Sequence, residues 1–326
     1  MLYLIKNEWD KVFYQKNNYI MMILIVLLTA ALNFIPLLLG ENIKENNQYS
    51  DNWEQELKAQ IHDIKADNMD TLGNDAVLND LIATANQDQI DRLNYHLEQG
   101  IIPPSDTNFY SALVRTSNLT VLVGAFVAII ASGIMSKEFS MKTIKLLLIH
   151  SRSRTSVFIS KYFFLLLLVI FYYFLLYVST ASFALLFTNM NPTSDYVFMG
   201  SDGLYTHLHF GYYFVSLSVS NILYLIIIAT IGFVVSTISR NTTIASVTTL
   251  GSIFLGPGFT AYLFTKTNLA RYLLMANWNI KQYFLDRTTT LNNGISLPFS
   301  IVIISIYMIS GISLSYYLFT KRDILI

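Results

Sequence analysis

Long apolar runs separated by polar segments occupy most of this chain. Each run is close to or above the length of about 18 residues that a helix needs to cross a bilayer, and the first, at 1.5 Å per residue, covers about 30 Å. The runs are residues 19–39, 119–134, 162–187, 213–238, 244–264 and 295–319. The second run begins in polar sequence, so the pattern does not define its first turn. We predict an all-α polytopic membrane protein with six transmembrane helices.

The residues before the first run, 1–18, carry a second kind of pattern. Apolar residues recur at helical spacing, and Lys6, Asn7, Asp10 and Lys11 lie on the opposite side. The apolar set is Leu2, Ile5, Trp9, Val12 and Phe13. This pattern predicts an amphipathic helix along the inner membrane surface, and a disordered basic lead-in is the alternative.

Residues 40–117 are polar and separate the first run from the rest of the membrane region, residues 118–326. Residues 41–117 hold fourteen acidic and five basic residues, and apolar residues recur there at helical spacing. Asp51 and Glu54 form a capping-box pattern, whereas Gly100, Pro103 and Pro104 end the last helical stretch. We expect a small helical extracytoplasmic domain. Its acidic surface either attracts a cationic ligand or is simply solvated.

The distribution of basic residues predicts the orientation. Residues 136–161 hold six basic residues and one acid, and the segments on that side of the membrane hold twelve basic residues in total. Basic segments beside spans stay in the cytoplasm, so we place both termini there. Four further basic residues lie in 265–294, where a central Lys or Arg would cost a seventh crossing about 2.5 to 3.5 kcal/mol. We therefore expect 265–294 to be helical and to lie at the outer interface.

Composition and motifs exclude several functions. The chain is 53% hydrophobic and 13% charged, it has no cysteine, and it contains no GxxxxGK[ST] phosphate-binding loop. His207 and His209 have the spacing of a metal-binding pair, but Asp202 is the one other potential ligand nearby, so we expect no metal site. We likewise expect no directly bound cofactor and no enzymatic activity. We expect membrane lipid to be a partner and expect no nucleic-acid partner.

The predicted spans hold polar but no charged residues in their middles, so any energy for transport should come from outside them. The polar residues that could line a pathway are Asn33, Asn221, Thr248, Thr249 and Thr260. The alternative for each is an interhelical hydrogen bond. Gly256, Pro257 and Gly258 should break or kink the fifth span.

The basic segment 136–161 resembles a known motif. It is similar to the EFxxGTxKxLL…PxSR…K pattern of permease subunits of ATP-binding-cassette exporters of the type-2 class, and residues 95–104 (YHLEQGIIPP) resemble an extracellular segment of one bacterial branch. Lys142 and Ser151 depart from the glycine and proline common in that family. The matching residues are Glu138, Phe139, Thr143, Lys145, Leu147, Ser153, Arg154 and Lys161.

The resemblance implies that this loop contains a coupling helix, which docks on a separate nucleotide-binding subunit. Met141, Ile144 and Leu148 would form its apolar stripe, and charged residues would fix the register at its rim. The implied docking residues are Glu138, Phe139, Met141, Lys142, Thr143, Ile144, Lys145, Leu148, Arg152 and Arg154. The alternative is that the charged residues of this loop only bind it to lipid headgroups.

The resemblance further implies a permease subunit in a bacterial plasma membrane that exports an amphipathic or hydrophobic substrate, such as a peptide, an antibiotic or a lipid-like molecule. Its partners would be two copies of a cytoplasmic ATPase, which bind ATP and Mg²⁺, and a second permease copy or a sibling permease. The alternative function is a receptor or scaffold that does not transport, whose acidic external domain senses a ligand.

Overall fold

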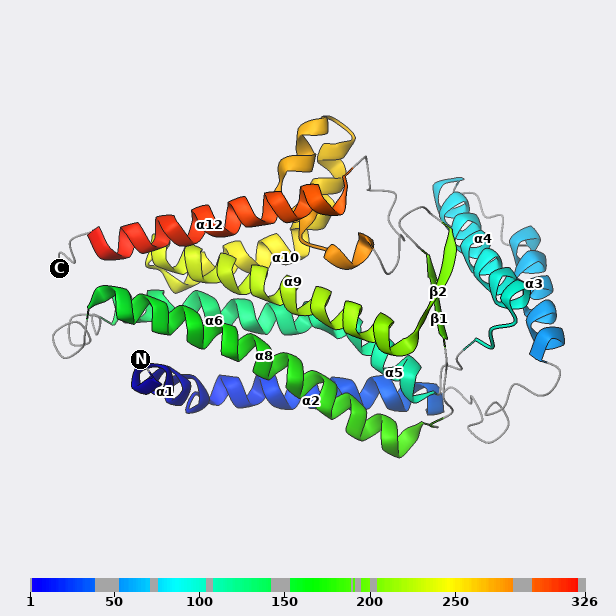
Figure 1. Cartoon of the computed structure of the whole chain (residues 1–326), viewed down its shortest axis with the longest axis horizontal. Coiled ribbons are helices and arrows are strands. Elements are labelled where there is room, and N and C mark those ends of the chain that lie inside the picture. Colours follow the sequence, from blue (N-terminus) through cyan, green and yellow to red (C-terminus); the bar gives the residue numbers. More distant parts are fainter. Residues whose placement is uncertain are drawn as a thin grey trace.

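Six long apolar helices form the body of the protein and run side by side in Figure 1. The computed structural model describes residues 2–38, 53–70, 76–103, 108–141, 153–188, 190, 195–199, 204–283 and 295–321. The membrane-spanning helices are α2 (Lys16–Leu38), the continuous segment Phe109–Ser140, α8 (Arg154–Phe187), α9 (Phe210–Ser239), α10 (Thr242–Phe264) and α12 (Leu297–Lys321). Their lengths and apolar composition confirm the prediction of an all-α polytopic membrane protein with six transmembrane helices.

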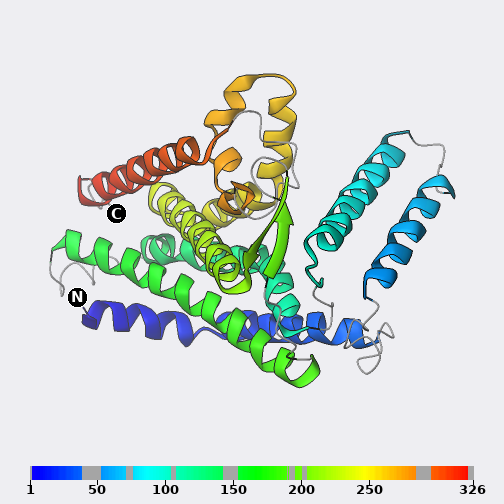
Figure 2. The same ribbon diagram turned by 45° about the vertical axis from the view of Figure 1, so that its right-hand side comes forward.

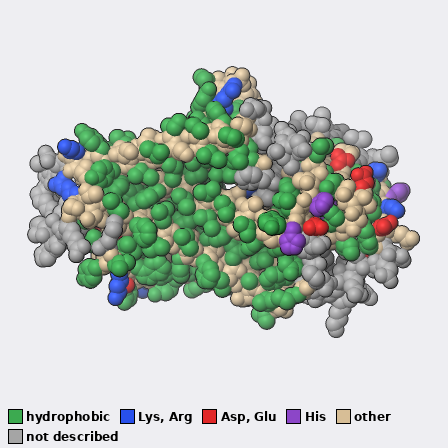
Figure 3. All heavy atoms as spheres, in the orientation of Figure 1, with side chains coloured by type: hydrophobic (Ala, Val, Ile, Leu, Met, Phe, Trp, Pro, Cys, Tyr) green, Lys and Arg blue, Asp and Glu red, His purple; other side chains and the backbone are tan. Residues whose placement is uncertain are grey.

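The two ends of the bundle differ in the side chains that they expose. Both termini lie at one end, together with the end of α6 and the beginning of α8 (Figure 1); we call it the terminal end. Figure 3 shows hydrophobic side chains over the visible face of the bundle. Lys and Arg lie near the terminal end, at the top of the view and at the opposite end, where Asp, Glu and His also gather.

The second span begins earlier than its apolar run indicated. Helix α5 (Phe109–Thr116) continues through a 3-10 turn, η1 (Ser117–Leu119), into α6 (Thr120–Ser140). Asn108 caps α5 by accepting a hydrogen bond from the backbone N–H of Tyr110 at 2.9 Å. Ala112 and Leu113 are buried, and α5 packs on α8. Tertiary packing therefore extends this helix through sequence that is too polar to be recognised as part of a span.

Helix α1 (Leu2–Phe13) packs its apolar side on the bundle. The rings of Trp9 and Phe13 stack with centroids 4.4 Å apart, and both rings meet Phe171 of α8 edge to face. Leu2 at the start of the helix remains exposed. The predicted amphipathic helix is present, and part of its apolar face contacts protein.

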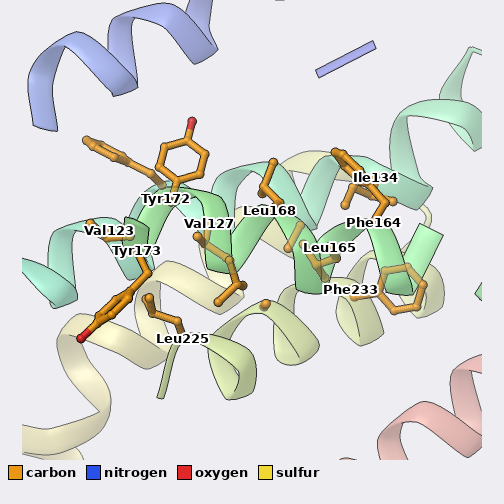
Figure 4. Close-up of a cluster of buried hydrophobic side chains, with 14 of the residues drawn as sticks. Val123, Val127, Ile134, Phe164, Leu165, Leu168, Tyr172, Tyr173, Leu225 and Phe233 are labelled. Atoms are coloured by element: carbon orange, nitrogen blue, oxygen red, sulfur yellow. The ribbon is translucent and has the colours of Figure 1, made fainter. Parts of the chain in front are cut away.

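The bundle core is centred on α6, which packs against α8, α9 and α10. The side chains that meet there are shown in Figure 4: Val123, Val127, Ile134, Phe164, Leu165, Leu168, Tyr172, Tyr173, Leu225 and Phe233. Small residues let α6 and α9 approach closely. A Cβ atom at Gly232 would come within 2.9 Å of the Cβ of Ala131 and 3.4 Å of the backbone oxygen of Ala128. This is the packing that small residues permit between membrane helices.

A helical hairpin and a β-hairpin lie at the end opposite the termini (Figures 1 and 2). The helices are α3 (Trp53–Asp70) and α4 (Ala76–Gln99), as expected for the polar segment. The β-hairpin pairs β1 (Asp195–Met199) with β2 (Tyr205–His209) in antiparallel register and was not predicted. Its residues Val197 and Phe198 are buried. Two five-residue strands have little pattern of their own, and packing on neighbouring elements stabilises them.

The β-hairpin also carries the two histidines that were weighed as a metal pair. The phenol oxygen of Tyr95 on α4 lies 3.0 Å from Nδ1 of His207, and Tyr205 donates to the carboxylate of Asp88 on α4 at 2.7 Å. His209 caps α9, because its Nδ1 accepts a hydrogen bond from the N–H of Gly211 at 3.3 Å. These contacts join α4 to the hairpin and the hairpin to α9.

The segment after α10, residues 265–283, is helical, as expected, but in three short pieces. It consists of η2 (Asn268–Tyr272), α11 (Leu274–Asn277) and η3 (Ile280–Tyr283), and we call it the 265–283 cap. Trp278 is 3% exposed and belongs to a buried cluster with Ala128, Ile228 and Ile253 of three spanning helices. Trp278 therefore inserts among the spanning helices. The location of the segment at the outer interface stays a prediction, and residues 284–294 lie outside the described residues.

Helix α10 continues through Pro257 without a break. Figure 1 shows that the last turns of α10 run in a different direction from its first turns, which agrees with the expected kink. Gly256 makes room for the cap, since a Cβ there would lie 2.7 Å from Sδ of Met275.

Candidate functional site

The candidate site is the terminal end of α6 and α8, the two helices that flank the basic loop. Four of the predicted docking residues are described: Glu138 and Phe139 in the last turn of α6, Met141 directly after it, and Arg154 as the first residue of α8. The others, Lys142, Thr143, Ile144, Lys145, Leu148 and Arg152, lie outside the described residues. The apolar stripe of Met141, Ile144 and Leu148 therefore stays a prediction.

Four charged side chains form a network at this site. Oε1 of Glu138 lies 2.8 Å from Nζ of Lys161 on α8 and 2.8 Å from Nζ of Lys11 on α1. Oε1 of Glu8 lies 2.9 Å from Nζ of Lys161 and 3.1 Å from Nζ of Lys11. Each carboxylate thus contacts both ammonium groups. We call Glu8, Lys11, Glu138 and Lys161 the charge network.

Three of the four members of the charge network are buried, which is unusual for ionisable groups. Lys161 is 1% exposed, Glu8 6% and Glu138 8%. Lys161 also donates a 3.4 Å hydrogen bond to the backbone oxygen of Ile134. Charges can be buried when they are paired and hydrogen-bonded, and here two negative groups offset two positive ones. The network joins α1, α6 and α8 at one point.

Lys11 is the most accessible member of the network, with 42% of its side chain exposed. Burial alone would lower its pKa, but the carboxylates of Glu8 and Glu138 outweigh this effect and raise the pKa above the ordinary value of 10.5. Lys11 is therefore protonated at physiological pH. It supplies one of the two positive charges that balance the carboxylates of Glu8 and Glu138.

The position of Glu138 differs from its expected role. We expected this residue at the rim of a docking helix, but its carboxylate points into the protein and contacts Lys11 and Lys161. Glu8, Lys11 and Lys161 were not predicted as site residues, although Lys161 belongs to the motif that the basic segment resembles. The spacing of Glu8 and Lys11, three residues apart on one helix, was the available signal. The 127-residue separation of Lys11 and Glu138 explains why no local pattern reveals their contact.

Further contacts join the helix ends around the network. The guanidinium carbon of Arg240, which ends α9 in the left-handed conformation with φ 54°, lies 4.8 Å from the ring centroid of Phe139. Arg154 donates a 2.9 Å hydrogen bond to the backbone oxygen of Thr320 at the end of α12. The beginning of α8 is thereby tied to the last helix.

Hydroxyl groups connect α6 with α9 and α10 one turn deeper. Ser236 accepts a hydrogen bond from the N–H of Ser136 at 3.0 Å and donates to the backbone oxygen of Ser132 at 2.7 Å. The hydroxyl of Ser136 lies 2.8 Å from that of Thr242 at the start of α10. A displacement of the end of α6 would therefore reach α8, α9 and α10.

The five predicted pathway residues do not share one environment. The side chains of Asn33, Thr249 and Thr260 are buried and donate to backbone oxygens of their own helices at 2.7 to 2.8 Å. Asn221 is 5% exposed, inside the bundle. Thr248 is exposed and lines a groove between α9, α10 and α12. A role for these residues in a pathway stays a prediction.

The fold and these contacts define a six-span, all-α membrane protein whose terminal end is held by a buried charge network. The chain belongs to the family described as "Protein of unknown function (DUF2705)", whose model matches residues 76–325. It is similar to "Uncharacterized protein YhcI" of Bacillus subtilis (strain 168), with 30% identity over 328 residues that cover 99% of each chain. It is also 30% identical over 222 residues to "Uncharacterized membrane protein YdbK" of the same organism, across 68% of this chain and 85% of that protein.

Proposed function

We propose that this chain is the permease subunit of an ATP-driven exporter in a bacterial plasma membrane, with both termini in the cytoplasm. Its partners are two copies of a cytoplasmic ATP-binding-cassette ATPase, which bind ATP and Mg²⁺, and a second copy of this chain or a sibling permease. The exported substrate is amphipathic or hydrophobic. The motif resemblance of residues 136–161 and the basic character of that segment support this assignment.

The observation that carries the proposal is the charge network. It lies where the two helices that flank the basic loop meet, and its contacts of 2.8 to 2.9 Å attach these helices to each other and to α1. A partner that pushes on the loop would displace the ends of α6 and α8 together, because separating them would leave buried charges without their partners, at a cost of several kcal/mol. Binding energy at the loop is thereby converted into a tilt of spanning helices.

Met141 offers a sharper test of docking than Glu138 does. A Glu138→Lys substitution would place three ammonium groups beside one carboxylate, so a loss of function would report a disrupted charge network. Met141 is 68% exposed at the start of the loop and belongs to the predicted apolar stripe. Tyr14, which is 84% exposed and follows α1, provides a matched control at the same end of the molecule.

The experiment is affinity purification of the full chain from its native membranes in mild detergent. An ATPase with a phosphate-binding loop should copurify with the wild type and with Tyr14→Asp. Met141→Asp should retain at least about tenfold less, because a carboxylate in an apolar interface costs more than 1.4 kcal/mol. Folding of each variant is checked by its elution volume and its thermal transition.

Three results would count against the proposal. Purification without any nucleotide-binding ATPase would remove the source of energy. Copurification of a signalling protein instead would favour a receptor or scaffold. Equal retention of the ATPase by Met141→Asp and Tyr14→Asp would show that docking does not use the exposed end of α6.

A further inference from the structure

A groove of about 470 Å³ lies between α9, α10 and α12, with Leu273, Leu274 and Met275 of the 265–283 cap also in its wall. Phe259 and Leu314 in its lining are 55% and 49% exposed on the outside of the bundle. Because these helices span the membrane, the groove opens toward the bilayer. Its size falls in the range of about 300 to 1,000 Å³ that is typical of small-molecule sites.

The described residues that line the groove are uncharged, and most of their hydroxyl groups are already hydrogen-bonded. Thr230 donates to the backbone oxygen of Ile226 at 2.8 Å, and Ser252 donates to that of Thr249 at 2.7 Å. Ser310 likewise donates to the backbone oxygen of Tyr307 at 3.2 Å. Of the fifteen lining residues, none is charged. A charged or strongly polar group would lose its hydration there without compensation, whereas a hydrocarbon chain has no hydrogen bonds to lose.

The groove is elongated as well as apolar. Its lining extends along α10 from Thr248 to Phe259, which is about 16 Å at 1.5 Å per residue. An extended alkyl chain can lie along that length in contact with apolar side chains.

We propose that this groove binds one acyl chain of a membrane phospholipid, which enters from the bilayer. The uncharged lining and the elongated shape match a hydrocarbon chain, and the opening toward the membrane supplies its route. The proposal does not rest on the export function, because it concerns lipid binding by the chain itself.

The groove is tested with a phosphatidylcholine that carries a diazirine near the end of one acyl chain. The purified full chain is reconstituted with this lipid, transferred to detergent to dilute exchanging lipid, and irradiated, and the labelled residues are identified by mass spectrometry. Met308 lines the groove, whereas its neighbour Ile309 is 67% exposed and is absent from the lining. Labelling of Met308 should persist in detergent, and labelling of Ile309 should disappear.

A filling substitution provides the matched variant. Gly311 lines the groove, and a Cβ there would lie 3.3 Å from Cγ2 of Val234, so Gly311→Phe places a bulky ring against the α9 wall of the groove. It should reduce labelling of Met308 by roughly tenfold or more, the factor that corresponds to two fewer buried CH₂ groups. Ile309→Phe adds a similar side chain to the same helix outside the groove and should leave the labelling of Met308 unchanged. If Gly311→Phe fails to fold, Leu314→Trp fills the groove from its exposed edge.

Three outcomes would overturn the proposal. Equal labelling of Met308 and Ile309 in detergent would mean contact with bulk lipid only. Unchanged labelling of Met308 in both filled variants would place the chain elsewhere. The third outcome comes from a Met308→Cys variant, which can be oxidised in membranes without background disulfides because the protein has no cysteine. Efficient disulfide-linked dimers would then assign the groove to a second copy of this chain.

Discussion

Individual residues hold the terminal end together, and Lys161 is the central one. Its ammonium group contacts the carboxylates of Glu8 and Glu138 and is 1% exposed. Lys161→Met should destabilise the protein by about 3 to 5 kcal/mol, because it leaves two buried carboxylates with only Lys11. The measurement is the thermal transition of the purified protein in detergent.

The control for this prediction restores charge balance. In the double variant Lys161→Met with Glu138→Gln, the remaining charged pair is Glu8 and Lys11, 3.1 Å apart. Most of the lost stability should return. If the single and double variants unfold at the same temperature, the charge network does not carry the stability assigned to it.

His96, near the end of α4, predicts a pH response outside the membrane. It is 1% exposed, and its Nδ1 lies 2.9 Å from the backbone oxygen of Ile101, so Nδ1 carries the proton of the neutral ring. Burial, together with Arg92 nearby, lowers its pKa below the ordinary value of 6.5, although the hydrogen bond to Ile101 opposes this. As pH falls, the unfolded chain binds the proton first, so stability is complete above about pH 6.5 and declines below it.

Hydrogen exchange of the amides at the end of α4 measures this effect. Protection should decrease between about pH 7 and pH 5 after correction for the intrinsic exchange rate. In His96→Gln the protection should no longer depend on pH in this window. A pH response that survives the substitution would assign it to another group.

At the scale of elements, the 265–283 cap is held on α12 by a small hydrogen-bond network. Ser300 donates to Oδ1 of Asn277 at 2.6 Å and lies 2.5 Å from the phenol oxygen of Tyr283. Asn277 donates in turn to the backbone oxygens of Arg271 and Leu273. All three side chains are buried. The cap therefore depends on satisfied polar contacts as well as on the packing of Trp278.

Ser300→Ala should loosen the cap without unfolding the bundle. It leaves the amide oxygen of Asn277 without its partner, at a cost of about 1 to 3 kcal/mol. Hydrogen exchange should increase in residues 268–283 and remain unchanged in α6 and α8. Ser305→Ala removes an exposed hydroxyl that bonds only within α12 and should have no effect. Increased exchange throughout the protein would contradict an independent role of the cap.

At the scale of the whole molecule, the proposed orientation gives opposite accessibilities to the two ends. Single cysteines are informative because the chain has none of its own. In intact cells, a membrane-impermeant maleimide should label His62→Cys in α3, whereas Met141→Cys should react only after permeabilisation. The two positions are both exposed, so equal intrinsic reactivity is expected in the purified protein. The reverse pattern would place the basic loop outside the cell.

Much of this architecture could be predicted because it depends on local composition. A run such as 162–187 cannot be exposed to water, and its backbone groups must be paired within a helix when it enters lipid. The polar segment that forms α3 and α4 was predicted for a similar reason, since apolar residues recur in it at helical spacing. The proposed orientation rests on a count of basic residues, which also needs no contacts.

The sequence by itself thus determined the class of protein, the spanning segments and the basic segment at their end. Only the tertiary structure decided that Glu8, Lys11, Glu138 and Lys161 meet, that Trp278 inserts among the spanning helices, and that an apolar groove remains between α9, α10 and α12. The physical reason is the separation along the chain over which each effect acts. Burial in lipid acts on each segment separately, whereas a charge network or a groove forms only when residues from distant segments pack together.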